Sequence, residues 1–195
     1  FTDSFSISSQ EIKPYGLAFN NDGTKMYVSG WAGDDVNEYA LTTAFDVSTA
    51  SFTQNFSTEG TGRSNPSAVQ FNADGTLMYV LQGDTNARIQ EYSLTTAFDI
   101  STASFTNRVF DATTEDNRPR GFCFSNNHSQ LFITGWRNDT VNEYTVNYSL
   151  PDTSHSDEPV DSSPSYFLFE RDDWDARGYV LEEPTTVYQN ILSEN

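Results

Sequence analysis

The residues of this chain that could do chemistry are few, and they form no familiar catalytic pattern. Only two histidines occur, His128 and His155, so no local motif builds a zinc site or a Ser-His-Asp triad. The Asp-Gly pairs at 22–23 and 74–75 lack the further acids at alternate positions that a calcium loop uses, and we interpret them as turns. We therefore expect no catalytic residue, no metal and no cofactor.

A second set of residues has the composition of a recognition surface. Trp and Arg dominate the hot spots of binding surfaces, and a Trp ring also stacks on sugars. Two tryptophans stand at equivalent places in a repeated sequence, and each is followed by acidic or amide residues. The predicted partner-binding residues are Trp31, Asp34, Asp35, Arg88, Trp136, Arg137, Asn138 and Asp139. The alternative is that each Trp packs its own repeat against a neighbour.

The elements that must position these residues come from a sequence repeated three times, with a period of about 52 residues. Pro14, Pro66 and Pro119 open equivalent phrases. Period-2 alternation, turn residues and aromatic or β-branched runs predict four short strands in each repeat. In the first repeat these strands are Gly16–Phe19, Lys25–Ser29, Val36–Leu41 and Ser51–Phe56.

Four antiparallel strands per repeat are typical of the blades of a β-propeller. We predict an all-β fold: a β-propeller-like array of three four-stranded antiparallel blades plus an acidic C-terminal tail. Residues 1–148 form the repeat domain, residues 149–165 a Ser/Asp/Pro-rich linker, and residues 166–195 an acidic segment. In such blades the loops before the first strand and after the second strand emerge on the same rim. That rim collects the predicted partner-binding residues and most basic residues of the repeats: Lys13, Arg63, Arg88, Arg118, Arg120 and Arg137.

The phase of the repeat leaves the closure of the propeller open. Residues 1–6 align with the fourth strand of the other repeats, so they could pair with the third strand of the last repeat and close a ring. Four arrangements are consistent with this phase: a compact three-bladed ring, a six-bladed ring of two chains, a fourth blade from the C-terminal segment, or part of a larger propeller. We favour the compact ring slightly. Because the chain opens inside a repeat without Met, we expect a processed product or a segment of a longer protein.

The composition narrows the choice of partners. With 28 acidic and 10 basic residues, the formal charge of −18 disfavours nucleic acid and anionic membranes as partners. No run of 18 apolar residues occurs, so no membrane insertion is expected. The single cysteine, Cys123, lies on a predicted strand, where we interpret it as a small buried or half-buried side chain.

The first repeat also resembles a known group of blades. Its phrase PYGLAFNNDGTKMYV, at residues 14–28, is similar to the blade motif of YVTN-type and lactonase-like propellers, and the resemblance covers residues 1–148. The connection TTAFDVSTA, at residues 42–50, is similar to repeats of uncharacterised marine bacterial and phage proteins. The resemblance implies a propeller, a fold that serves enzymes, binding proteins and surface proteins alike.

These observations predict a non-enzymatic binding or structural module of a secreted or particle-surface assembly, such as a phage virion. We expect it outside the cell, on a cell surface or on a virion, in a larger assembly or a homo-oligomer, recognising a protein or glycan partner. The alternative is a lactonase-like or other hydrolytic propeller, which we expect to need acids on the channel-lining first strands. Those strands carry Leu17, Val69 and Phe122 instead. A Glu recurs on each third strand, and we interpret it as a hydrogen-bonding or solvent-facing residue: Glu38, Glu91 and Glu143.

Overall fold

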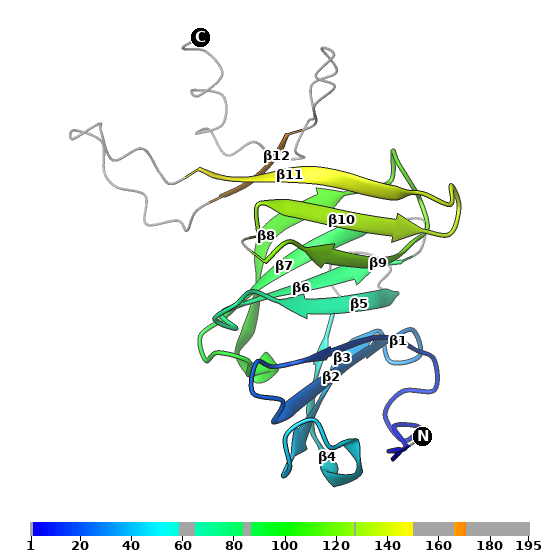
Figure 1. Cartoon of the computed structure of the whole chain (residues 1–195), viewed down its shortest axis with the longest axis vertical. Helices are drawn as coiled ribbons and strands as arrows, with labels where there is room; N and C mark the ends of the chain where they lie inside the picture. Colours follow the sequence, from blue (N-terminus) through cyan, green and yellow to red (C-terminus); the bar gives the residue numbers. More distant parts are fainter. Residues whose placement is uncertain (1, 59–64, 84–86, 127, 150–165, 171–195) are drawn as a thin grey trace, which may run out of the picture.

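The structure is a computed structural model that describes residues 2–58, 65–83, 87–126, 128–149 and 166–170 (Figure 1). It consists of three antiparallel sheets of four strands, which confirms the predicted all-β array of blades. Blade 1 contains β1 (Pro14–Phe19), β2 (Lys25–Gly30), β3 (Asp35–Leu41) and β4 (Ala50–Ser57). Blade 2 contains β5 (Pro66–Phe71), β6 (Leu77–Gln82), β7 (Arg88–Leu94) and β8 (Ala103–Asp111). Blade 3 contains β9 (Pro119–Phe124), β10 (Gln130–Gly135), β11 (Val141–Ser149) and β12 (Tyr166–Glu170).

The turns between the first and second strands form as their residue types predict. Gly23 and Gly75 have φ angles of 72° and 73°, in the left-handed region that glycine adopts without strain. The Asp22 carboxylate accepts hydrogen bonds from the Thr24 backbone N–H at 2.9 Å and from its hydroxyl at 2.6 Å. These bonds lower the pKa of Asp22. The carboxylate is therefore engaged in the turn.

The turns between the third and fourth strands contain two short 3-10 helices that the sequence patterns did not reveal. They are η1 (Val47–Thr49) and η2 (Ile100–Thr102). Asp46 and Asp99 cap them, each accepting a hydrogen bond from the backbone N–H two residues further on.

The three blades lie side by side in chain order, because β1 contacts β5 and β5 contacts β9 (Figure 1). We call the side of a blade that turns toward the preceding blade its leading face, and the opposite side its trailing face. The trailing face of blade 1 and the leading face of blade 2 share one hydrophobic core, which contains Tyr27, Val36, Val69, Met78, Val80, Tyr92, Leu94 and Ile100. Blades 2 and 3 share a second core in the same way, which contains Tyr79, Leu81, Ile89, Phe122, Leu131, Ile133, Tyr144 and Val146. Because successive side chains of a strand point to opposite faces of the sheet, the strands of blade 2 supply apolar residues to both interfaces.

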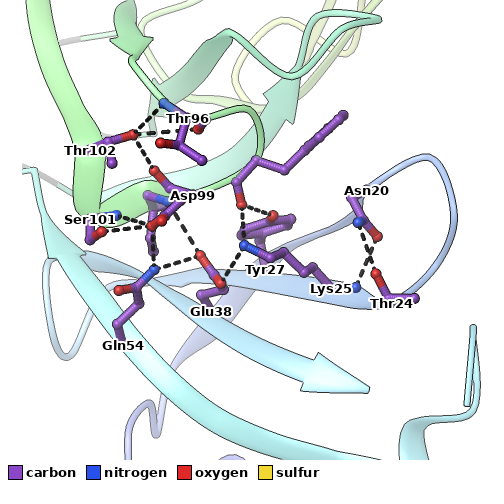
Figure 2. A network of polar contacts seen from close by, with 12 residues as sticks. Asn20, Thr24, Lys25, Tyr27, Glu38, Gln54, Thr96, Asp99, Ser101 and Thr102 are labelled. Carbon is purple, nitrogen blue, oxygen red and sulfur yellow. Dashed lines mark hydrogen bonds and ion pairs between the residues drawn. The ribbon is translucent and has the colours of Figure 1, made fainter. Parts of the chain in front are cut away.

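A polar network joins blade 1 to the η2 turn of blade 2 (Figure 2). The buried Glu38 carboxylate lies 2.9 Å from the Lys25 ammonium and accepts hydrogen bonds from the Gln54 side chain at 2.9 Å and the Ile100 N–H at 3.3 Å. The Lys25 ammonium and the Tyr27 hydroxyl both donate to the Phe98 carbonyl, at 2.8 and 2.6 Å. The interpretation of the recurring Glu as a hydrogen-bonding residue is confirmed at this position.

The favoured compact ring is wrong. Residues 2–6 form no strand, and β11 pairs with β12 instead, through Thr145–Ser149. Phe5 packs against blade 1, with its ring 5.7 Å from that of Tyr39. The N-terminal segment is therefore committed to the leading face of blade 1, and no strand from it reaches blade 3.

The interpretation of Cys123 as a buried or half-buried residue is also wrong, because its thiol-bearing side chain is exposed. Its equivalents Ala18 and Gln70 are half-buried. Gln70 reaches the next blade through a 2.9 Å hydrogen bond to the Phe122 carbonyl. Cys123 lies on the trailing face of blade 3, where no fourth blade covers it within the described residues.

The remaining predictions on organisation lie mostly outside the described residues. The linker, apart from residue 149, and the acidic segment, apart from β12, are not among them, so the domain boundaries remain predictions. Within the described part of the chain, no helix is long and apolar enough to cross a membrane.

Candidate functional site

A cluster of aromatic rings and guanidinium groups occupies the rim at the start of the inner strands. Tyr15 and Trp31 stack, with ring centroids 4.4 Å apart and planes 23° apart. The Arg120 guanidinium lies 4.9 Å from the Trp31 ring, 5.8 Å from the Tyr15 ring and 5.9 Å from the Trp136 ring. Arg118 lies 5.3 Å from the Trp136 ring. These five residues are the rim cluster, and their spacing is that of cation–π contacts.

Arg120 is the residue that joins the three blades at this rim. Its side chain leaves β9 of blade 3 and donates a 2.7 Å hydrogen bond to the carbonyl of Gly83, which follows β6 of blade 2. The same guanidinium lies against Trp31, which follows β2 of blade 1. Because a guanidinium has five N–H donors, this bond leaves donors over for a carboxylate or a phosphate.

Repeat equivalence explains why this cluster occurs once and not three times. Trp31, Gly83 and Trp136 are equivalent residues directly after the second strands. Tyr15 and Arg120 are equivalent residues after the strand-opening prolines, where blade 2 has a serine. The blades therefore share a backbone and differ in the side chains that they present at this rim.

Two buried carboxylates hold the loops that carry the tryptophans. Glu11 accepts hydrogen bonds from the backbone N–H groups of Ala32 and Gly33, at 3.2 and 3.1 Å. Asp116, its equivalent in blade 3, accepts from the N–H groups of Arg137 and Asn138, at 3.1 and 3.0 Å. A carboxylate that accepts several N–H bonds is a strong acceptor and restrains the loop that donates them. Hydrogen bonds to buried carboxylates thus restrain the loops that begin at Trp31 and Trp136.

The structure places the predicted binding residues in three different settings. Trp31, half-buried, and Trp136, exposed, belong to the rim cluster. Asp34 and Asp139 are equivalent loop residues with φ angles of 50° and 53°, three positions after each Trp. Arg137 and Asn138 are exposed and lie between Trp136 and Asp139.

The other two predicted residues are engaged elsewhere. Asp35 is buried and accepts 2.7 Å hydrogen bonds from the side chains of Asn37 and Asn55. Arg88 pairs with Asp111 at 3.3 Å, between β7 and β8. In the part of the chain that the structure describes, Asp35 and Arg88 thus bond to these residues and not to members of the rim cluster. Within the described residues, no group of three or more His, Cys, Asp or Glu side chains could hold a metal ion.

The binding-residue prediction missed three members of the cluster: Tyr15, Arg118 and Arg120. The two arginines were placed on the correct rim but were not included among the binding residues. A signal for Tyr15 and Arg120 was available, because they differ from each other at a position where the surrounding phrases are alike. Where equivalent positions of the repeats carry different residue types, those residues can have different roles.

No protein-family model and no curated protein matches this chain. Solved structures do match. The periplasmic gluconolactonase of Pseudomonas aeruginosa is 19% identical, with 80% of this chain and 42% of that chain covered and a TM-score of 0.53. A candidate 6-phosphogluconolactonase of Bacteroides fragilis is 14% identical, with 69% and 35% covered and a TM-score of 0.54. A β-propeller domain from Myceliophteria thermophila is 12% identical, with 67% and 39% covered and a TM-score of 0.49.

The two lactonase-named structures support the propeller fold, and the chain spans about two fifths of their length. They also contradict the prediction that the chain is not an enzyme, since several similar structures are named as gluconolactonases or 6-phosphogluconolactonases. That prediction assumed that a hydrolytic propeller takes its acids from the first strands. Rim loops can also supply them, because catalytic residues are often carried by loops on a rigid scaffold.

Proposed function

We propose that the rim cluster binds a small anionic carbohydrate, and that a sugar-acid lactone is the substrate class that fits it best. The observation that carries the proposal is Arg120, which is fixed by the Gly83 carbonyl and surrounded by the rings of Trp31 and Trp136. A fixed guanidinium recognises a carboxylate or phosphate with two parallel hydrogen bonds.

The aromatic residues of the cluster suit the apolar side of such a ligand. Trp136 is exposed, so its ring is open to a sugar ring, whereas Trp31 is half-buried against Tyr15. Arg118 and Arg120 also concentrate positive charge at one place on a chain whose formal charge is −18. An anionic ligand is therefore attracted to this rim more than to the rest of the chain.

The reaction that this substrate class allows is hydrolysis of the lactone. Water adds to the carbonyl carbon, the bond between that carbon and the ring oxygen breaks, and a proton passes from the water to the released oxygen. A carboxylate can accept that proton and return it as a general base and then a general acid. Asp139, exposed in the loop of Trp136, and its equivalent Asp34 are the carboxylates that we propose for this role.

The experiment is a panel of lactones with and without a phosphate, with spontaneous hydrolysis subtracted, alongside calorimetric binding of the product acids. We expect Arg120→Gln to lower kcat/KM or affinity for the phosphorylated compounds by at least about tenfold, the effect of losing one charged hydrogen bond. Arg88→Gln is the matched control, because Arg88 lies on the same rim but pairs with Asp111. Equal effects of the two substitutions, or no turnover and no binding, would refute the proposal.

A second candidate is recognition of a glycan or an acidic protein by the same rim, for which the exposed Trp136 is the favouring observation. Binding of larger glycans, with no turnover of any lactone, would select this candidate. A location outside the cell, on a cell surface or on a virion remains part of this second proposal.

A further inference from the structure

Within the described residues, the leading face of blade 1 is covered only in part. Met26, Val28, Tyr39 and Leu41 are buried there, in a cluster that includes Phe5 and Ile7 of the N-terminal segment, but Leu17 is not. Leu17 is 62% exposed, whereas its equivalents Val69 and Phe122 are 2% and 7% exposed. Val69 is buried by blade 1 and Phe122 by blade 2, in the two cores that the blades share. The leading face of blade 1 thus has the residue type of a blade interface but no preceding blade within the described residues.

The trailing face of blade 3 is uncovered in the complementary way. Val141 is 67% exposed, whereas its equivalents Val36 and Ile89 are 0% and 4% exposed. Glu143 is also exposed, whereas its equivalent Glu38 is buried and accepts a hydrogen bond from the η2 turn of the next blade. This face therefore carries a trailing-face pattern with no following blade.

The N-terminal segment packs on the leading face of blade 1 in the way that the outer strand of a preceding blade packs on the next blade. Phe56 of β4 and Phe110 of β8 each pack edge-on against the third-strand Tyr of the next blade, at 5.1 and 4.8 Å. Phe5 packs edge-on against Tyr39 at 5.7 Å, in the same way. Phe5 therefore occupies the place of the outer-strand aromatic residue of a preceding blade.

The strand registers identify the residue that would lie opposite Phe5 if Phe5 joined an outer strand. Phe56 lies opposite Val36 in the β3–β4 pair, and Phe110 lies opposite Ile89 in the β7–β8 pair. The equivalent of Val36 and Ile89 in blade 3 is Val141. β12 pairs with β11 only from Thr145 onward, so the edge of β11 at Val141 is not taken by β12.

We propose that two copies of this chain join head to tail into a six-bladed ring, in which blade 3 of each copy packs on blade 1 of the other. Residues 2–6 of one copy then extend the edge of β11 of the second copy, with Phe5 opposite Val141. The same contact covers Leu17 and brings Glu143 to the N–H of Val47, the equivalent of Ile100.

Symmetry and size both agree with two copies. A head-to-tail contact closes a ring when its rotation is a half-turn, and closure buries the exposed blade faces and strand edges. One copy spans 35% to 42% of the length of the similar lactonase-named propellers, so two copies approach one such chain.

The first test is a disulfide between the two proposed partners, in a Cys123→Ser background. Opposite residues of antiparallel strands lie within the Cα separation that a disulfide bridges. We expect the Phe5→Cys/Val141→Cys variant to form a covalent dimer on non-reducing gels, and each single-cysteine variant to stay largely unlinked. A double variant that stays reduced, or that links only within one chain, would overturn the proposal.

The second test is the molar mass in solution, measured by light scattering after size exclusion. We expect twice the chain mass of 21.9 kDa for the unmodified chain, and the mass of one chain for Leu17→Glu or Val141→Arg. Thr53→Glu is the control, because Thr53 is exposed on the outer strand β4, and it should leave the dimer intact.

Mixing distinguishes a blocked contact from a damaged fold. A mixture of Leu17→Glu and Val141→Arg copies retains one unmodified interface, so we expect the dimer to return in the mixture only. An unmodified chain that stays monomeric at its highest soluble concentration, or that grows into open oligomers, would refute the two-copy ring.

Discussion

The Lys25–Glu38 ion pair between strands β2 and β3 offers a direct test of how the blades are joined (Figure 2). Lys25→Leu introduces the residue that blade 2 has at the equivalent position, Leu77, so the change suits the fold of a blade. It removes the ammonium 2.9 Å from the Glu38 carboxylate and one of the two donors to the Phe98 carbonyl. The buried Glu38 carboxylate then keeps two uncharged donors, the Gln54 side chain and the Ile100 N–H.

The magnitude follows from what remains at the site. Removing one member of a buried ion pair costs about 3–5 kcal/mol, because the other charge stays buried. We expect the lower end, about 3 kcal/mol, since Lys25 is 29% exposed and Glu38 keeps the Gln54 and Ile100 donors. For a domain of this size that loss lowers the Tm by about 6–12 °C.

The assay is equilibrium urea unfolding, followed by tryptophan fluorescence and far-UV circular dichroism to test two-state behaviour. The double variant Lys25→Leu/Glu38→Gln also removes the charge of the carboxylate, so it should recover about 2 kcal/mol of the loss. If Lys25→Leu costs less than about 1 kcal/mol, or if Glu38→Gln adds to the loss, the pair does not stabilise the blade junction and the reasoning is wrong.

Two further predictions concern buried carboxylates. Burial raises the pKa of Glu91 to about 6 from its ordinary 4.5, although Arg108 lies 2.7 Å away and opposes the rise. The folded state then binds the proton more tightly, so the free energy of unfolding should fall by up to about 2 kcal/mol as pH rises from well below 4.5 to well above 6, in urea titrations across this range. Glu91→Gln should flatten that slope, and an unchanged slope would assign it to other groups. Glu11→Ala leaves the N–H groups of Ala32 and Gly33 without their acceptor, and should cost about 1–3 kcal/mol in urea unfolding and speed chymotrypsin cleavage at Trp31. Cleavage at the original rate would show that the loop does not need the carboxylate.

Much of the fold could be predicted from the sequence because it depends on local rules. Period-2 alternation identified the strands of blade 1 to within two residues, and the Asp-Gly pairs identified the turns. Alternation also places Tyr27 and Met26 on opposite faces, whichever blades cover them. The η1 and η2 turns were missed because single-turn 3-10 helices have no periodicity to detect.

The candidate site was predicted only in part. The chain order of strands places Trp31 and Trp136 on one rim, and that much follows from the topology of an antiparallel blade. The contacts of Arg120 with Trp31 and with the Gly83 carbonyl depend on how three blades are rotated about a common axis. The spacing of residues within one repeat does not determine this rotation between blades.

Exposure is the property that only the tertiary structure determined. Leu17 and Val69 have the same strand position and the same apolar type, yet one is exposed and the other is buried. Cys123 and Val141 are exposed for the corresponding reason on blade 3. A repeat determines which side of a strand is apolar, because alternation is local. Whether that side is covered depends on the presence of a neighbouring blade, which is a contact between residues distant in the chain or in another copy.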